Sequence, residues 1–327
     1  MNWRNKARLA KAIGKLPPAL SLSAYYFVQR KFGALRSANP VHLLKAGVAV
    51  VDFIQTYRRE LTGSEVFLEV GTGRCLSLPI AVWCCGAFQT ITVDLNPYLK
   101  SELIFEEIDY IKTHQESIRQ IFGAHAQKPI FRQRFELLLS CKRDLRELLS
   151  LINVRYLAPA DAGHLDLASR SIDYHVSYGV VEHVARSALD GIFSEAIRLL
   201  KSDGLALHYA ALADLFSGED DSISRVNFLQ FSEEEWDSIA GNRYMYHNRL
   251  RIDELIEVFT RAGFRILTVN AKVHPDSLRV LQSGALSLDV RFATKSPETN
   301  ASEHAWVVAE LPGSRCETGP ERGRLNG

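Results

Sequence analysis

The sequence predicts a single α/β domain built on a mostly parallel sheet of seven strands, with a helical extension before it and helical insertions within it. Short runs rich in β-branched residues alternate with segments of helical periodicity, which is typical of parallel strands joined by crossover helices. Over 327 residues, 46% are hydrophobic and 24% charged, so a large core can form. The longest apolar run, 78–88, is shorter than the roughly 18 residues that cross a bilayer, which argues against a membrane-spanning protein.

The elements follow in order along the chain. Residues 1–62 form a basic helical extension, 63–311 the main domain, and 312–327 a polar tail expected to be disordered. Helices are expected at 76–85, 189–200 and 253–261, and the last strand is expected to be antiparallel. The strands are expected at 66–70, 90–94, 154–158, 172–177, 204–211, 265–272 and 305–311.

Two segments are too long to be simple crossovers. The insertion 98–153 is expected to hold two amphipathic helices divided by Pro129. The insertion 212–250 is aromatic and polar and follows the fifth strand. Because loops at the carboxyl ends of strands bind ligands in open α/β sheets, we expect 212–250 to form a cap over a substrate.

The charge is divided unevenly. The chain has 39 basic and 38 acidic residues, but the first 51 residues hold nine Lys or Arg and no acid, which leaves 30 basic against 38 acidic residues, or −8, for the remainder. The basic segment fits a targeting peptide, an arm for anionic partners or a membrane surface, or a plain solvated helix. Nucleic acid is not expected as a partner, because the core is net negative.

Five cysteines are an odd number, and none has the spacing of a metal ligand set. We therefore expect reduced thiols in a cytoplasmic protein without a metal site, with weak membrane-surface contact through the basic segment left open. The oligomeric state is left open as well.

The most informative motif joins a strand to a glycine loop. The run 66–70 leads into Gly71, Thr72 and Gly73, where glycine permits a turn and a close backbone approach to a ligand. Asp94 closes the next strand, 23 residues after Gly71, where a carboxylate can accept hydrogen bonds from ribose hydroxyls. Glu69, two residues before the glycines, would repel a pyrophosphate but not a sulfonium. The motif thus predicts a nucleoside site that favours S-adenosyl-L-methionine.

With these residues in place, the sequence resembles the class I S-adenosylmethionine-dependent methyltransferases of the type 11 group, which have a Rossmann-like fold. The first motif of that family, an acid followed by GxGxG, matches 69–73, with Cys75 in place of the third glycine. Asp94 matches the acid that binds ribose. The pattern 171–184 matches a strand leading into a Glu-His pair, and 196–204 matches a helix end. A bacterial subgroup linked to polysaccharide and secondary-metabolite genes is suggested by 227–229 and 248–251.

The resemblance implies a set of cofactor contacts. Leu95 would flank the adenine, Asp161 and Ala162 would lie near its amino group, and Ser177 would border the cofactor at the end of the fourth strand. Asp161 could equally cap a turn before Gly163.

His183 is the candidate catalytic residue. An imidazole can take a proton from an acceptor hydroxyl or amine near neutral pH, but a packed or capping histidine is the alternative. We expect His175 to be buried structure, and His208 and Tyr209 are secondary candidates.

The candidate substrate-binding residues are Asp214, Asn248, Arg249 and Arg251. Arg251 stands where a helix N-cap is expected, and a cation there opposes the helix dipole, so it could be held for an anionic or hydroxyl-rich substrate. The alternative is a misplaced boundary with Asp253 as the cap.

The sequence therefore predicts a methyltransferase that uses S-adenosyl-L-methionine to methylate O or N of a small molecule, such as a sugar or a secondary metabolite. Such a reaction needs alignment and proton removal rather than a nucleophile triad. An NAD-dependent oxidoreductase and a non-catalytic partner protein with the same fold stay open as alternatives.

Overall fold

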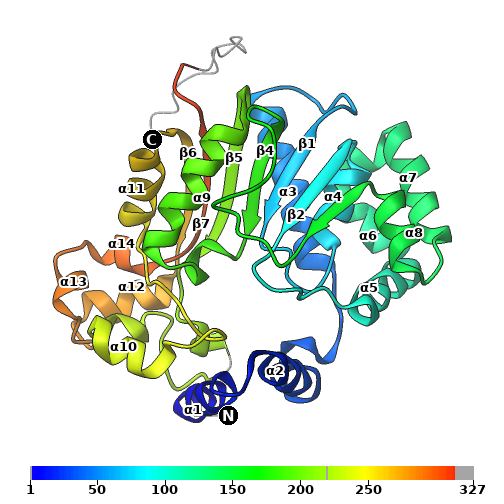
Figure 1. Cartoon of the computed structure of the whole chain (residues 1–327). Helices are drawn as coiled ribbons and strands as arrows, with labels where there is room; N and C mark the ends of the chain where they lie inside the picture. Colours follow the sequence, from blue (N-terminus) through cyan, green and yellow to red (C-terminus); the bar gives the residue numbers. More distant parts are fainter. Residues whose placement is uncertain (1, 219, 314–327) are drawn as a thin grey trace.

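The computed structural model describes residues 2–218 and 220–313, and a seven-stranded sheet forms its centre (Figure 1). The strand order is β3-β2-β1-β4-β5-β7-β6, with β7 antiparallel to both of its neighbours and the other pairings parallel. The strands are β1 (Val66–Val70), β2 (Gln89–Val93), β3 (Val154–Leu157), β4 (Ile172–Tyr178), β5 (Leu200–Ala211), β6 (Arg265–Val273) and β7 (Ser302–Glu310). The predicted Rossmann-like fold class is confirmed.

Helices cover both faces of the sheet (Figure 1). One face packs against α3 (Val41–Tyr57) and α4 (Ser77–Cys84), and the other packs against α9 (Arg186–Leu199) and α11 (Ile252–Ala262). Successive strand residues point to opposite faces, so Phe67 is buried among the first set of helices and Leu68 among the second. Because both faces are covered, apolar side chains of the central strands are buried on each side, together with a few polar ones such as His175.

The insertion after β2 holds four α-helices, so the expectation of two was wrong. They are α5 (Ser101–Thr113), α6 (Gln115–Phe122), α7 (Pro129–Ser140) and α8 (Leu145–Leu151), with the 3₁₀ turn η2 (Gly123–Gln127) before Pro129. Two local signals make the extra breaks. Gly123 has φ +50°, and the side chain of Asp144 accepts hydrogen bonds from the first amides of α8.

A cap stands beside the carboxyl ends of the strands and has three sources. The insertion after β5 supplies η4 (Leu215–Gly218), η5 (Asn227–Gln230) and α10 (Glu233–Ala240). The connection from β6 to β7, which the sequence analysis left unassigned, supplies α12 (Pro275–Gln282), α13 (Val290–Ala293) and α14 (Pro297–Ala301). The third source is α1 (Trp3–Gly14). Their shared apolar cluster includes Trp3, Ala7, Phe216, Phe228, Trp236 and Phe292.

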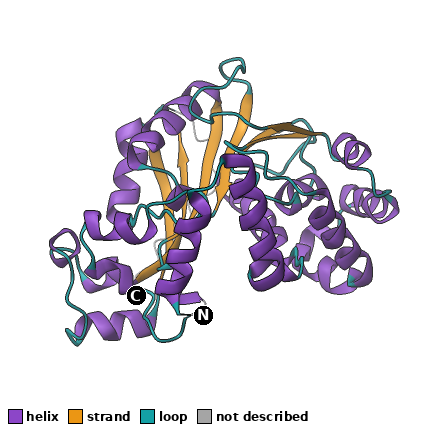
Figure 2. Cartoon of the chain, turned by 60° about the horizontal axis from the view of Figure 1, so that its bottom comes forward, coloured by secondary structure: helices purple, strands orange, loops and turns teal. Residues whose placement is uncertain are grey.

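The N-terminal helices α1 and α2 (Pro18–Phe32) lie beyond the carboxyl ends of the parallel strands, at the bottom of Figure 1. A short turn, η1 (Ala34–Arg36), leads from α2 towards α3, which is part of the layer on the sheet. Figure 2 brings this side of the molecule forward. Among the described residues, no helix is both long and apolar enough to cross a membrane. The expected tail lies, from residue 314 onward, outside the described residues.

Candidate functional site

The glycine loop after β1 is closed on one side and open on the other. Gly71 has φ +86°, and a Cβ added there would lie 2.3 Å from Cγ2 of Val180. Its amide donates to the carbonyl of Val93 at 2.7 Å, which turns the chain sharply at the end of β1. Gly73 has φ +63°, and an added Cβ would meet no described atom within 4 Å. The loop is thus packed tightly against Val180 at Gly71 and leaves open space at Gly73.

Asp94 joins this loop to the end of β2. Its Oδ2 accepts a hydrogen bond from the amide of Gly73 at 3.1 Å, and its Oδ1 accepts one from the amide of Asn96 at 3.0 Å. Burial raises the pKa of Asp94 above its ordinary value, and the two amides oppose that shift. Leu95, the next residue, is 68% exposed. A carboxylate beside an exposed apolar side chain suits the ribose and the base of a nucleoside.

Glu69 lies below the loop rather than at its mouth, and this corrects the electrostatic argument made from the sequence. The side chain is buried, and Oε2 accepts a hydrogen bond from Thr92 at 2.5 Å. Thr92 in turn hydrogen-bonds Thr72. Burial raises the pKa of Glu69 to about 8, since the Thr92 hydrogen bond opposes the shift only in part and the nearby Asp94 adds to it. At neutral pH Glu69 is therefore mostly neutral and repels no phosphate.

The end of β3 meets the same loops. The amide of Ala160 donates to the carbonyl of Asp94 at 2.9 Å, which brings the segment of Asp161 and Ala162 next to the Asp94 loop. Asp161 is exposed, and its Oδ1 accepts from the amide of Gly163 at 2.8 Å, so it does cap that turn. Ala162 is buried. Three strand ends thus converge on one edge of the sheet.

The side chain of Ser177, at the end of β4, turns away from that edge. It is buried, and Oγ lies 2.7 Å from Nδ1 of His208, whose Nε2 lies 3.1 Å from Nδ1 of His175. His208 packs edge-on against Phe193 of α9. The hydroxyl therefore belongs to the α9 layer, and only the main chain of Ser177 is left to border a cofactor. His175 is buried, as expected.

His183 is exposed on the turn η3 (Val181–His183), directly after β4. Its Nδ1 lies 2.9 Å from the carbonyl oxygen of Tyr246. A carbonyl only accepts, so Nδ1 carries the hydrogen and the lone pair of the neutral ring is on Nε2. The amide side chain of Asn248 holds the same turn by donating to the carbonyls of Val181 and Val184 at 2.7 and 2.9 Å. The cap thus fixes the orientation of the imidazole.

The four candidate substrate-binding residues are all buried inside the cap. Asp214 accepts from the side chain of Asn227 at 3.1 Å, and burial raises the pKa of Asp214 to about 6 despite that bond. Asn248 serves the turn of His183, as described above. Both side chains are therefore engaged inside the cap rather than directed at an acceptor.

The two arginines of this set bind main chain. Arg249 donates to the carbonyls of Phe228 and Phe231 at 2.9 and 2.6 Å, and Arg251 donates to that of Leu212 at 2.5 Å and to that of Asn300 at 3.2 Å. Arg251 is the N-cap of α11, so the predicted boundary is confirmed. Burial lowers the pKa of Arg251 to about 9. The predicted anion-binding role is replaced by one in tying the cap together, because main-chain carbonyls bind both guanidinium groups and Glu233 pairs with Arg249 at 3.1 Å.

Two residues at the site were given no role from the sequence. Arg74, directly after Gly73, places its guanidinium 5.0 Å from the ring centroids of both Tyr26 and Tyr98. Glu182 is buried, accepts at Oε1 from the amide of Ala211 at 3.1 Å, and has no described partner for Oε2. Burial raises the pKa of Glu182. The neighbouring motifs pointed to both positions, but only the fold shows which way these side chains face.

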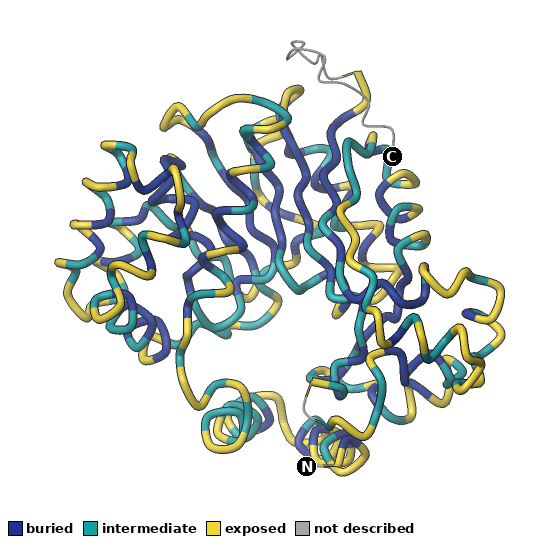
Figure 3. The backbone as a smooth tube through the Cα atoms, turned by 180° about the vertical axis from the view of Figure 1, so that it is seen from behind, coloured by how far each residue is buried: buried dark blue, intermediate teal, exposed yellow. Residues whose placement is uncertain are grey.

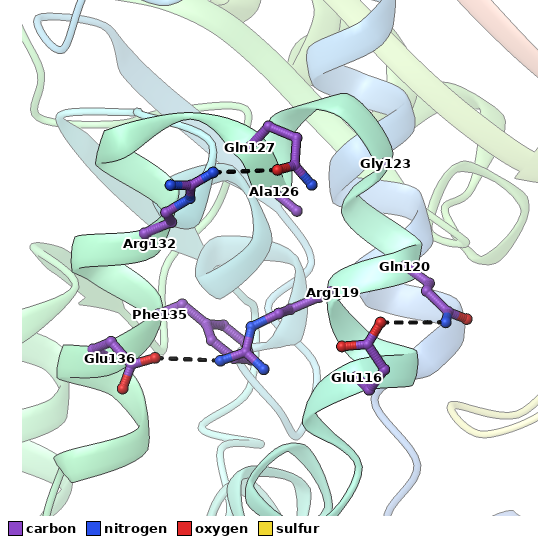
Figure 4. A pocket seen from close by; sticks show the side chains of 9 residues that line it. All are labelled: Glu116, Arg119, Gln120, Gly123, Ala126, Gln127, Arg132, Phe135 and Glu136. Atoms are coloured by element: carbon purple, nitrogen blue, oxygen red, sulfur yellow. Dashed lines mark hydrogen bonds and ion pairs between the residues drawn. The ribbon is translucent and has the colours of Figure 1, made fainter.

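A surface cavity of about 600 Å³ lies elsewhere, on the insertion after β2 (Figure 4). Its polar side chains pair with one another: Arg119 contacts Glu136 at 3.2 Å, and Arg132 contacts Gln127 at 3.2 Å. The lining residues are Glu116, Arg119, Gln120, Gly123, Ala126, Gln127, Arg132, Phe135 and Glu136. None of them lies on a strand end, so this cavity is not the candidate site.

Comparison with protein families identifies a methyltransferase domain over residues 137–208. The matched segment runs from α7 to β5 and includes β3, β4, the turn of His183 and α9. No curated protein matches the chain.

Solved structures with a similar arrangement share little sequence with this chain. A geranyl diphosphate C-methyltransferase of Streptomyces coelicolor A3(2), in complex with Mg²⁺, geranyl diphosphate and S-adenosyl-L-homocysteine, is 14% identical over 80% of this chain and 79% of its own, with a TM-score of 0.43. A methyltransferase of Methanosarcina mazei is 15% identical over 79% and 96%, with a TM-score of 0.40. The [4+2]-cyclase SpnF is 14% identical over 81% of both chains, with a TM-score of 0.43.

With TM-scores below 0.5, these structures share only the general arrangement of strands and helices with this chain. The family match over residues 137–208 and the seven-stranded fold confirm the resemblance of this chain to the class I S-adenosylmethionine-dependent methyltransferases.

Proposed function

We propose that the chain binds S-adenosyl-L-methionine at the carboxyl ends of β1, β2 and β3 and transfers its methyl group to an oxygen or nitrogen atom of a small molecule, such as a sugar or a secondary metabolite. The observation that carries the proposal is the 3.1 Å hydrogen bond from the amide of Gly73 to Asp94. It joins the glycine loop to the acid of the next strand, the two parts that a nucleoside site needs.

The residues at this edge fit the cofactor. The open space at Gly73 lets a ligand approach the backbone, where a larger residue would place a Cβ. Each carboxylate oxygen of Asp94 accepts one amide hydrogen bond and retains a lone pair for a ribose hydroxyl. The exposed Leu95 offers an apolar surface to a base. The preference for this cofactor over a dinucleotide rests on the methyltransferase domain match, because Glu69 is mostly neutral at pH 7.

The cofactor, when bound, supplies a methyl group on a sulfonium that leaves as a neutral thioether. The chain has to align an acceptor and remove its proton. His183 is exposed after β4, and the hydrogen bond to the Tyr246 carbonyl leaves Nε2 as the basic nitrogen. We assign to Nε2 the role of the base that accepts the proton of an acceptor hydroxyl or ammonium group. Asn248 then acts as a positioning residue, because it holds the turn rather than the acceptor.

Titration calorimetry with S-adenosyl-L-methionine, S-adenosyl-L-homocysteine and NADH tests the cofactor. We expect binding of the first two, and D94N should weaken both by about 10- to 100-fold, since a hydrogen bond to a charged group contributes roughly 1.5–3 kcal/mol. Asp276, exposed on α12, provides the matched control D276N, which should leave both affinities unchanged.

The outcomes separate the alternatives. NADH binding without a response to S-adenosyl-L-methionine would favour an oxidoreductase. Formation of S-adenosyl-L-homocysteine with any member of a panel of hydroxyl and amine acceptors would exclude a non-catalytic partner protein. Unchanged cofactor affinity of D94N would contradict the assignment of Asp94.

A further inference from the structure

The outward surface of α1 and α2 combines exposed apolar side chains with positive charge. Figure 3 shows exposed residues along both helices. Of nine large hydrophobic side chains that are exposed among the described residues, five belong to this short stretch. They are Leu9 (40% exposed), Leu16 (41%), Leu20 (62%), Phe27 (58%) and Phe32 (76%). We call these five residues the apolar strip.

Exposed cations lie on the same segment as the apolar strip, and the segment itself contributes no acidic side chain. Arg4, Arg8, Lys15, Lys31 and Arg36 are exposed on the same two helices and on η1. No acidic residue precedes Asp52 in the sequence. The remainder of the chain has a net charge of −8, so the net positive charge belongs to this segment. A solvated helix of a globular protein would expose polar residues of both signs, and this surface does not.

The inner side of the two helices already packs against the rest of the protein through other residues, so the apolar strip is not part of the hydrophobic core. In α1, Trp3, Ala7, Ala10 and Ile13 are buried, and Trp3 packs 5.5 Å from Phe216 of the cap. In α2, Tyr25 stacks on Tyr244 with centroids 3.9 Å apart.

Polar contacts hold α2 on its other side. Arg30 forms two hydrogen bonds with Glu106 of α5, at 2.6 and 3.0 Å, and Tyr26 hydrogen-bonds Glu102. The helix thus contacts both Tyr244 and α5. Leu20 and Phe27, at i and i+7, lie on one face of α2 and are exposed.

We propose that this surface docks on a bilayer that contains anionic lipids. Amphipathic helices with basic residues beside Phe and Leu lie in the interface, with the apolar side chains in the headgroup and acyl boundary and the cations at the phosphates. Neither the apolar side chains nor the cations suffice alone. Five apolar side chains without charge would give no preference for anionic lipids, and a few cations alone bind a membrane weakly at physiological salt. The apolar strip and the exposed cations therefore act together.

Docking would place a lipid surface next to the cofactor loops. Arg74 and Lys100 both lie 5.0 Å from the ring of Tyr26, so α2 rests directly on the loops that follow β1 and β2. The inference about docking depends on the surface alone and not on the proposed methyl transfer. Binding to vesicles can therefore succeed or fail independently of cofactor binding.

Co-sedimentation of the full chain with vesicles tests the proposal. We expect binding to vesicles of phosphatidylcholine with 30% phosphatidylglycerol, used here as a probe composition, and little binding to pure phosphatidylcholine. Replacing Lys15, Lys31 and Arg36 together by Gln should weaken binding by about 100-fold, since each cation near the surface contributes about 1 kcal/mol. Raising the salt concentration should weaken binding of the unmodified chain as well.

The apolar strip has a matched control. The double variant L20S/F27S should lose vesicle binding by at least 10-fold, while L137S/F88S, which removes two exposed apolar residues outside the N-terminal helices, should bind as the unmodified chain does. The residues are exposed, so all variants should unfold at the same urea concentration, which confirms that they are folded.

Several results would overturn the proposal. They are absence of binding to anionic vesicles, equal loss in L20S/F27S and in the control, binding to an RNA oligomer but not to vesicles, and a stable dimer that occludes the apolar strip.

Discussion

Replacing Glu69 by Gln removes a titrating group from the interior while it preserves the size of the side chain. In the folded chain burial raises the pKa of Glu69 to about 8, whereas an unfolded chain would return it to its ordinary value of about 4.5. Between these two values the folded state binds more protons than the unfolded state. The free energy of unfolding contributed by Glu69 is therefore fully present below about pH 4.5 and is lost as the pH rises towards 8.

The size of the effect follows from the shift. Each unit of pKa difference corresponds to about 1.4 kcal/mol, so between pH 5 and pH 8 the unmodified chain should lose about 3 kcal/mol of unfolding free energy relative to E69Q. Urea unfolding of both proteins, followed by tryptophan fluorescence at pH 5, 6, 7 and 8, measures this difference. The contributions of all other titrating groups cancel in this difference, because both proteins contain them.

Glu65 supplies a control of opposite sign. It is buried as well, and burial alone would raise its pKa, but hydrogen bonds from Thr62, Gly63 and Ser64 outweigh burial and lower it. Its contribution should be constant above pH 5 and decline only in acid. If the unfolding free energies of E69Q and the unmodified chain changed with pH in parallel, Glu69 would be ionised at pH 7. A negative charge would then lie beneath the glycine loop.

Three further predictions concern the loop, the turn and the cap. G71A should lose about 2–4 kcal/mol of unfolding free energy, because the added Cβ would meet Val180 and a φ of +86° is strained for alanine. The double variant G71A/V180A removes the clash but not the backbone strain, so it should regain only part of that loss. Full recovery of the unfolding free energy would show that the backbone angle is not strained. Once an acceptor is known, H183Q should reduce methyl transfer by about 10²- to 10⁴-fold, with cofactor affinity unchanged in calorimetry. Normal turnover of this variant would exclude His183 as the base. R251M should destabilise the chain by about 3 kcal/mol and expose the cap to limited proteolysis, because the carbonyls of Leu212 and Asn300 lose their hydrogen-bond donor. A protease-resistant variant of normal stability would contradict the role of Arg251 in holding the cap together.

Local patterns in the sequence determined the positions of the strands and the glycine loop. A buried parallel strand is rich in apolar and β-branched residues, so residues 66–70, apolar except for Glu69, were predicted with the bounds that β1 has in the structure. The loop at Gly71 and Gly73 and the acid Asp94 were found from their spacing, because the turn at the end of a strand requires particular residues over a short stretch. Arg251 is the N-cap that the sequence suggested, although α11 begins at Ile252 rather than at the expected residue 253.

Tertiary packing alone decided what the polar side chains do. The pKa of Glu69 is raised to about 8 because the surrounding layers remove the carboxyl group from water, and no local sequence pattern indicates that burial. Arg251 is occupied by carbonyls of Leu212 and Asn300, 39 and 49 residues away along the chain. The connection from β6 to β7 joins the cap because its Phe292 packs with Trp3 and Trp236, which lie far from it in sequence. Burial and hydrogen-bond partners depend on such distant residues, whereas strand and turn propensities depend on neighbours.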